Sequence, residues 1–156
     1  WGLLMPETIK EGKESIDFTL KDQSDKEITL SDFKNQKVLL SFHPLAWTSV
    51  CAEHMQLLEE NYKRFEKLNT IPFGISVDTV PSKNAWSIEL GIESTRILSD
   101  FWPHGETANA YGIFNEEHGT SERANVIIDE NQKVSSVKVY PMGEVPDINE
   151  ILDKLE

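Results

Sequence analysis

Two continuous apolar runs separated by a helical pattern constrain the fold of this chain more than any other feature. The runs are KVLLSF at Lys37–Phe42 and IPFGISV at residues 71–77, and each is typical of a strand that is covered on both faces. Between them, apolar side chains from Cys51 to Phe65 recur in alternating steps of four and three residues, as on one face of a helix. Apolar strands separated by helices predict an α/β fold with a buried central sheet.

Segments of the same two kinds alternate along the rest of the chain. Residues 22–33 read as a turn, a short strand and a brief turn or helix, for which Ser31 is a candidate N-cap. Pro81 and Ser82 open a helix that Gly91 closes. The other predicted strands are residues 16–20, 96–100, 123–129 and 133–140, and the other predicted helices are residues 105–112 and 146–155. The last two strands pair around the turn DENQ, so we expect one mixed central sheet flanked by helices, in a single domain of residues 1–156.

Composition narrows the classes of function. The chain is 38% hydrophobic and 27% charged, which fits a soluble globular domain. Its formal net charge of -12 argues against nucleic-acid and anionic-membrane partners, because the electrostatic attraction that drives such binding would be repulsive here. No apolar run approaches the length of a membrane span, and WGLLMPE is too short for a signal peptide. We therefore expect a cytoplasmic protein; the sequence leaves open whether Trp1 and Gly2 are native.

Cys51 is the only cysteine of the 156 residues, so it cannot form an internal disulfide, and a lone thiol suits a reducing compartment. A dithiol–disulfide oxidoreductase needs a second cysteine. A zinc site built on Cys51 with His43 and His54 lacks the usual ligand spacing and a fourth ligand. A cysteine hydrolase needs a base and an orienting residue to which no pattern points. No metal and no cofactor is therefore expected.

The position of Cys51 favours an activated sulfur. Thr48 and Ser49 are both good N-cap residues, which would place Cys51 in the first turn of a helix, where the helix dipole stabilises an anion. The Thr48 hydroxyl could accept a bond from the thiol or donate one to a substrate oxygen, and Pro44 stiffens the preceding loop. Lone cysteines are, however, often inert buried hydrophobes, and the position alone leaves both interpretations open.

Longer stretches of the chain resemble a known family. PLAWTSVC matches the Pro-x-x-x-Thr-x-x-Cys signature of peroxiredoxins, with Pro44, Thr48 and Cys51 in register. GISVDTVPSKNAW resembles the family's segment after the cysteine helix, and Arg123 stands just before the penultimate strand, as in the family. SDFWPHG and AYGIFNE are similar to the one-cysteine alkyl hydroperoxide reductase E group. The resemblance covers about residues 16–140 and implies a thioredoxin-like fold.

The resemblance also implies roles for particular residues. Cys51 would be the peroxidatic cysteine, whose thiolate attacks the terminal peroxide oxygen and becomes a sulfenic acid. Arg123 would lie near the sulfur and stabilise the negative charge that develops as the O–O bond breaks. Thr48 would bind the peroxide by a hydrogen bond, and Pro44 would shield the pocket. The backbone N–H groups of Val50 and Cys51 would complete the oxygen-binding site.

Several positions depart from the family's pattern. Many relatives carry a glutamate three residues after the cysteine, where this chain has His54, so a hydrogen bond from that acid to the arginine is in doubt here. Trp47 and His43 stand where other aromatic residues are frequent, and we expect both to line the loop, with Trp47 beside the substrate. Gln56 occupies a place where some peroxiredoxins have a resolving cysteine.

These observations predict a one-cysteine thiol-dependent peroxidase. Its substrates would be hydrogen peroxide and organic hydroperoxides, its reductant an external thiol or thiol protein, and its assembly a homodimer, as the resemblance implies. The alternative from another class is a thioredoxin-like redox sensor or binding module that relays oxidation to a partner protein. A third possibility is a thioredoxin-like domain in which Cys51 is inert.

Overall fold

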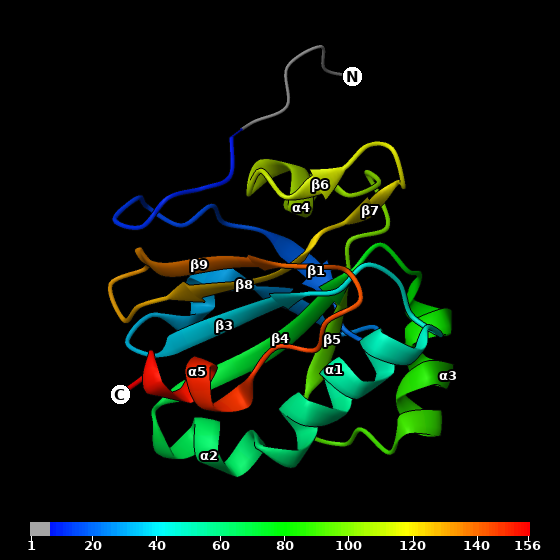
Figure 1. The fold of residues 1–156 in the computed structure, drawn as a ribbon, viewed down its shortest axis with the longest axis horizontal. Coiled ribbons are helices and arrows are strands. Elements are labelled where there is room, and N and C mark those ends of the chain that lie inside the picture. The colour runs from blue at the N-terminus through cyan, green and yellow to red at the C-terminus, as the bar shows by residue number, and fades with distance from the viewer. Residues whose placement is uncertain (1–6) are drawn as a thin grey trace.

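The computed structural model describes residues 7–156 as a mixed sheet with helices on both sides (Figure 1); Trp1 and Gly2 lie outside these residues. The strands of the main sheet are β1 (Thr19–Lys21), β2 (Glu27–Thr29), β3 (Lys37–Phe42), β4 (Thr70–Ser76), β5 (Arg96–Ser99), β8 (Arg123–Ile128) and β9 (Val134–Tyr140). The helices are α1 (Ser49–Glu60), α2 (Tyr62–Lys67), α3 (Val80–Leu90), α4 (Glu106–Ala110), α5 (Ile148–Asp153) and the 3₁₀ helix η1 (Leu30–Phe33).

The sheet has the strand order β2-β1-β5-β4-β3-β8-β9. β3 lies near its centre, parallel to β4 and antiparallel to β8. The β8–β9 hairpin follows the predicted pairing, and the mixed sheet flanked by helices confirms the predicted fold class. The ends of β3 and β4 and the start of β8 therefore meet at one edge, where α1 also begins.

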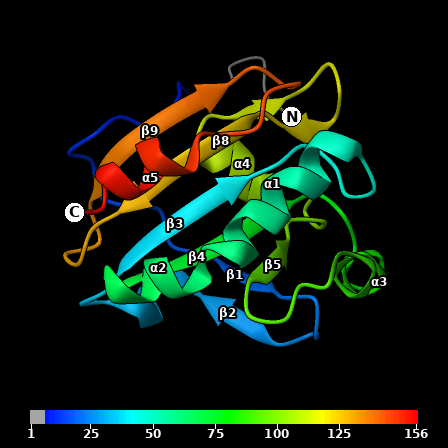
Figure 2. The ribbon, with the colours of Figure 1, turned by 60° about the horizontal axis from the view of Figure 1, so that its bottom comes forward.

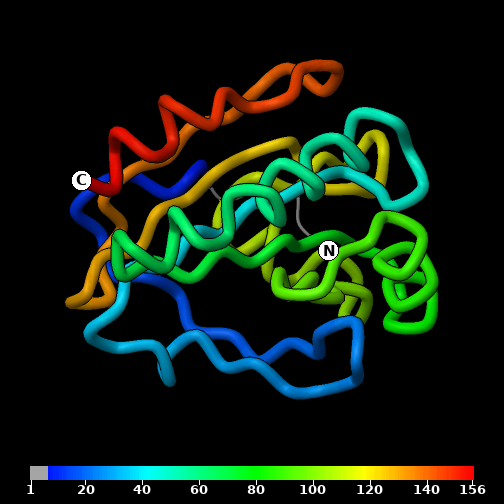
Figure 3. Tube along the Cα trace, turned by 90° about the horizontal axis from the view of Figure 1, so that it is seen from below, coloured from blue at the N-terminus to red at the C-terminus, as the bar shows by residue number. Residues whose placement is uncertain are grey.

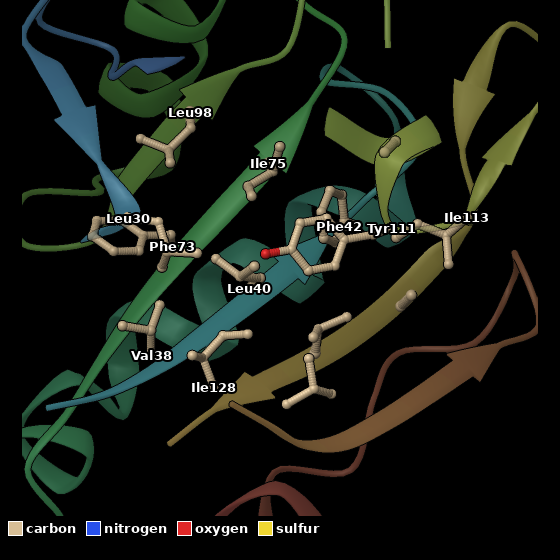
Figure 4. Packing of buried hydrophobic residues seen from close by; sticks show 14 of the residues in the cluster. Leu30, Val38, Leu40, Phe42, Phe73, Ile75, Leu98, Tyr111, Ile113 and Ile128 are labelled. Atoms are coloured by element: carbon tan, nitrogen blue, oxygen red, sulfur yellow. The ribbon is translucent and has the colours of Figure 1, made fainter. Parts of the chain in front are cut away.

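Side chains of β3 alternate between two cores because successive residues of a strand point to opposite faces. Val38, Leu40 and Phe42 pack into one core with Phe73 and further residues of β4, η1, α4 and β8 (Figure 4). Leu39 packs into the other core, which α1, α2, α3 and α5 cover (Figures 2 and 3). The alternation also turns Ser41 toward α1, in the layer that holds Cys51.

Three local predictions need correction, and one hairpin was missed. The strand expected at residues 16–20 begins only at Thr19. Ser31 is not an N-cap, because η1 already begins at Leu30. The helix expected from Cys51 to Phe65 is interrupted at Asn61, whose side-chain amide donates to the carbonyl of Leu57 at 2.8 Å and competes with the helical ladder. A small hairpin of β6 (Phe114–Asn115) and β7 (Thr120–Ser121) was not predicted.

The prediction for α3 is confirmed at both ends. Its first turn contains Pro81, and the Thr79 side chain caps it by accepting a bond from the Ser82 N–H. Gly91 ends it in the left-handed region at φ 71°, a conformation that glycine adopts without steric cost. This well-defined helix presents Lys83, Trp86 and Ser87 to the interior.

Candidate active site

Cys51 is the third residue of α1 and is 1% exposed. It lies on the apolar face of the helix with Met55 and Leu58. Thr48 precedes the helix in an extended conformation, and its hydroxyl donates to the Leu45 carbonyl at 2.7 Å instead of capping α1. Cys51 thus lies in the first turn of α1, where the positive end of the helix dipole stabilises a negative charge.

Hydrogen bonds to Asp78, just before α3, and to Ser82 of α3 fix the loop that precedes α1. The Ala46 N–H donates to Asp78 Oδ2 at 2.8 Å, and the Trp47 indole N–H donates to Ser82 Oγ at 3.0 Å. Trp47 has a left-handed backbone at φ 68° and its side chain is 56% exposed. Pro44 is half-buried. The loop is therefore tied down by hydrogen bonds, while Trp47 presents a large apolar surface to solvent.

Arg123, the first residue of β8, is 2% exposed and brings a cation to Cys51 from 72 residues away in the chain. Its Nη2 donates to Cys51 Sγ at 3.3 Å. Nε and Nη2 also donate to the Met142 carbonyl, at 3.1 and 2.9 Å. A guanidinium with two nitrogens on one oxygen has little rotational freedom, so Met142 fixes the direction in which Arg123 faces the sulfur.

His54 holds the remaining end of the guanidinium. It lies one helical turn after Cys51, is 0% exposed, and its Nδ1 accepts a bond from Arg123 Nη1 at 2.9 Å. Because a guanidinium can only donate, Nδ1 carries the lone pair and Nε2 the proton. Burial and the nearby Arg123 charge lower the pKa of His54 to about 3, so the ring is neutral near pH 7. The histidine thus supplies the acceptor that a glutamate would offer.

A chain of hydrogen bonds behind His54 fixes its ring. Nε2 lies 2.6 Å from Ser41 Oγ, which donates to Asn125 Oδ1, also at 2.6 Å. The Asn125 amide in turn donates to the Tyr140 hydroxyl at 3.3 Å. Each donor in this order has one acceptor, which leaves a single tautomer for His54. Strands β3, β8 and β9 together orient the arginine through a buried polar chain.

Ser41, Asn125 and Tyr140, which continue the hydrogen bonds behind His54, were not predicted as site residues. Ser41 and Asn125 are polar residues inside otherwise apolar strands, and that interruption was a usable signal. The carbonyl of Met142 carries no signal in a sequence. His43, predicted to line the loop, is buried, and its ring lies 5.5 Å from the ring of Trp86.

Residues 7–156 contain no group of three or more histidine, cysteine, aspartate or glutamate side chains arranged to hold a metal ion. Within the same range, no helix combines the length and the apolar character that crossing a membrane requires. The chemistry that the geometry offers is that of a buried sulfur between a helix N-terminus and a fixed guanidinium, which is suited to a thiolate nucleophile.

Comparisons with known proteins all indicate the same family. The model of the AhpC/TSA family matches residues 12–137. Alkyl hydroperoxide reductase E of Mycobacterium tuberculosis is 36% identical over 137 residues, which cover 87% of this chain and 89% of the relative. Peroxiredoxin 2 of Picrophilus torridus is 34% identical over 146 residues, covering 90% and 71%.

Two solved structures extend the likeness to the fold. The reduced 2-Cys peroxiredoxin of Plasmodium vivax superposes with a TM-score of 0.84 at 28% identity, over 93% of this chain and 79% of that one. The AhpC of Enterococcus faecalis superposes with a TM-score of 0.85 over 93% and 89%; at 22% identity it supports the fold alone.

Proposed function

The chain belongs to the AhpC/TSA family and is a thiol-dependent peroxidase with a thioredoxin-like fold; on this premise we propose that Cys51 and Arg123 carry the reaction, in a one-cysteine cycle. The observation that carries the proposal is the 3.3 Å hydrogen bond from Arg123 Nη2 to a buried sulfur at a helix N-terminus. Both features stabilise negative charge on the sulfur, and a thiolate is the reactive form of cysteine.

The proposed step is an attack on the terminal oxygen of a hydroperoxide. The Cys51 thiolate forms an S–O bond, the O–O bond breaks, and the departing alkoxide or hydroxide takes up a proton, which leaves a sulfenic acid. Arg123 donates to the charge that moves from sulfur to oxygen. The N–H groups of Val50 and Cys51 donate to the peroxide oxygens, and Thr48 Oγ1, whose own proton goes to the Leu45 carbonyl, accepts from the peroxide O–H. Pro44 and Trp47 wall the entrance.

The second half of the cycle needs a partner. Cys51 is the one cysteine among these 156 residues, so no second thiol of the chain can attack the sulfenic acid. We propose that an external thiol or thiol protein attacks the sulfenic acid, forming a mixed disulfide and releasing water. A second thiol then attacks the mixed disulfide, which frees Cys51 as the thiol and leaves the two reductant sulfurs joined in a disulfide. A free thiol persists in a reducing compartment, and we place the protein in the cytoplasm, with residues 1–156 forming one peroxiredoxin domain.

Mass spectrometry of Cys51 tests this function. One equivalent of hydrogen peroxide should convert the thiol to a sulfenic acid, which a dimedone-type reagent traps as a stable adduct. In a second sample without this reagent, a suitable added thiol should restore the Cys51 thiol through many turnovers. Reaction no faster than that of free cysteine contradicts the peroxidase function. Rapid oxidation that no small thiol reverses, but that passes to another protein, would instead indicate a redox sensor.

We further propose that the protein is a homodimer. Leu45, Trp47, Phe101 and Trp102 are 41, 56, 47 and 80% exposed. Trp47 is bonded to Ser82, and the neighbouring Pro81 lines a cleft of about 470 Å³ together with Phe101 and Trp102. Trp47, Phe101 and Trp102 therefore gather around the start of α3, and exposed apolar patches of this kind mark protein interfaces.

Sedimentation velocity at micromolar concentration tests the dimer. The unaltered chain should sediment as a dimer, and Trp102→Glu should sediment as a monomer, because it places a charge in the apolar patch. Ile88→Glu is the matched control, since Ile88 is 73% exposed on α3 and outside the set of patch residues. A monomer for the unaltered chain contradicts the proposal.

A further inference from the structure

Lys83 is a buried cation that the proposed reaction does not use. It lies on the inner face of α3, one turn before Trp86, and is 0% exposed. Its Nζ is among the buried side-chain atoms of residues 7–156 that have no hydrogen-bond partner. Burying an ammonium without a partner is costly, so a lysine in this place requires an explanation other than packing.

Lys83 lies in the same buried region as Cys51. Trp86 lies against His43, whose ring is 6.2 Å from the ring of His54, one helical turn from Cys51. The charged and titratable groups that act on Lys83 are Asp78, Cys51, Asp100 and His43. The ammonium and the sulfur therefore occupy the same buried region, the first contributed by α3 and the second by α1.

The two carboxylates near Lys83 are engaged elsewhere. Asp78 Oδ2 accepts bonds from the Ala46 N–H at 2.8 Å and from Ser76 Oγ at 2.6 Å. Asp100 accepts bonds from the N–H groups of Thr107 and Ala108, at 3.0 and 2.9 Å. Each acid thus has a structural task, one on the cysteine loop and one at the start of α4. Both carboxylates still act on Lys83 through space, and Cys51 is the third acidic group that does so.

His43 adds no charge to the surroundings of Lys83. Burial, with the Lys83 charge as the next cause, lowers the pKa of His43 well below its ordinary value, so the ring is neutral at physiological pH. Burial also lowers the pKa of Lys83 to about 7, while Asp78, Cys51 and Asp100 oppose the shift. An amine that titrates near neutral pH changes its charge readily when a neighbouring anion appears or disappears.

We propose that Lys83 is a second cation of the active site, which stabilises the Cys51 thiolate of the reduced enzyme through space while Arg123 stabilises it by direct contact. The proposal deepens the proposed function and rests on it only in requiring that Cys51 ionises. Since two interacting charges stabilise each other equally, the thiolate also holds the proton on Lys83.

Lys83→Met tests the first half of this linkage, because it keeps the length of the side chain and removes the charge. In the reduced protein without peroxide, the ultraviolet absorbance of the thiolate should appear at higher pH. In a separate measurement, the rate of reaction with peroxide at neutral pH should fall about tenfold, as expected when the pKa of the thiol rises by one unit. At alkaline pH the rate should recover. Lys63→Met, which removes an exposed charge on α2, is the control and should change neither quantity.

Cys51→Ser tests the reciprocal half in a protein that retains Lys83. NMR of the lysine side chains should show Lys83 titrating at lower pH in this variant than in the reduced unaltered protein. A purely structural lysine would alter the melting temperature on substitution but leave both titrations unmoved. Unchanged thiolate absorbance in a folded Lys83→Met protein, or an unchanged Lys83 titration in Cys51→Ser, overturns the proposal. Neither measurement uses peroxide, so either can fail while the peroxidase function stands.

Discussion

Replacing Cys51 by serine should abolish the reaction with hydroperoxides while the fold remains intact. A serine hydroxyl is a far weaker nucleophile than a thiolate at neutral pH and forms no stable counterpart of the sulfenic acid. The change is small in volume, and Arg123 Nη2 keeps an oxygen acceptor in place of Sγ, so little stability should be lost. Because these 156 residues contain no other cysteine, no second thiol can substitute.

Stopped-flow tryptophan fluorescence can measure this loss. Trp47 lies in the cysteine loop and Trp86 packs against His43 beside it, so oxidation of Cys51 should change their emission. Ser49→Ala is the matched control, since Ser49 begins the same helical turn and is exposed; it should react at the unaltered rate. Reaction of folded Cys51→Ser with peroxide would place the chemistry on another residue.

Arg123→Met should lower the second-order rate constant with hydrogen peroxide by a factor of roughly 10² to 10³, the usual cost of removing one preorganised donor to a developing charge. The substitution removes the 3.3 Å bond to the sulfur and leaves the Met142 carbonyl and His54 Nδ1 without their donor. Each buried acceptor left unpaired should cost about 1–3 kcal/mol of folding free energy. Thermal melting should therefore be recorded beside the kinetics.

Two further variants separate charge from orientation. Arg123→Lys keeps a cation but cannot span Sγ, His54 and the Met142 carbonyl together, so its rate should stay well below that of the unaltered protein. His54→Ala leaves the guanidinium on Met142 and frees only Nη1, so its loss should be smaller than that of Arg123→Met. His54→Gln supplies an acceptor again and should recover part of the rate. A folded Arg123→Met protein with an unaltered rate would remove Arg123 from the mechanism.

Local structure followed from the sequence wherever short-range chemistry decides it. β3 has the predicted bounds because six residues of nearly unbroken apolar character suit a strand covered on both faces. α3 ends at Gly91 because the left-handed residue after a helix favours glycine. The predictions failed where a side chain competes with the backbone, as at Asn61, or where pairing involves strands of two residues, as in β6 and β7.

The sequence by itself singled out the proposed nucleophile and its local setting, because Pro44, Thr48 and Cys51 lie within eight consecutive residues and a helix start acts on the residues of its own first turn. Its resemblance to a family also singled out Arg123. Only the tertiary structure decided the contacts and burial of the groups beyond this segment: the Met142 carbonyl that orients the guanidinium, the single tautomer of His54, and the burial of the Lys83 amine. Burial and the distances between charges arise from strands and helices that are far apart in the chain, and these two quantities set the charge of each group.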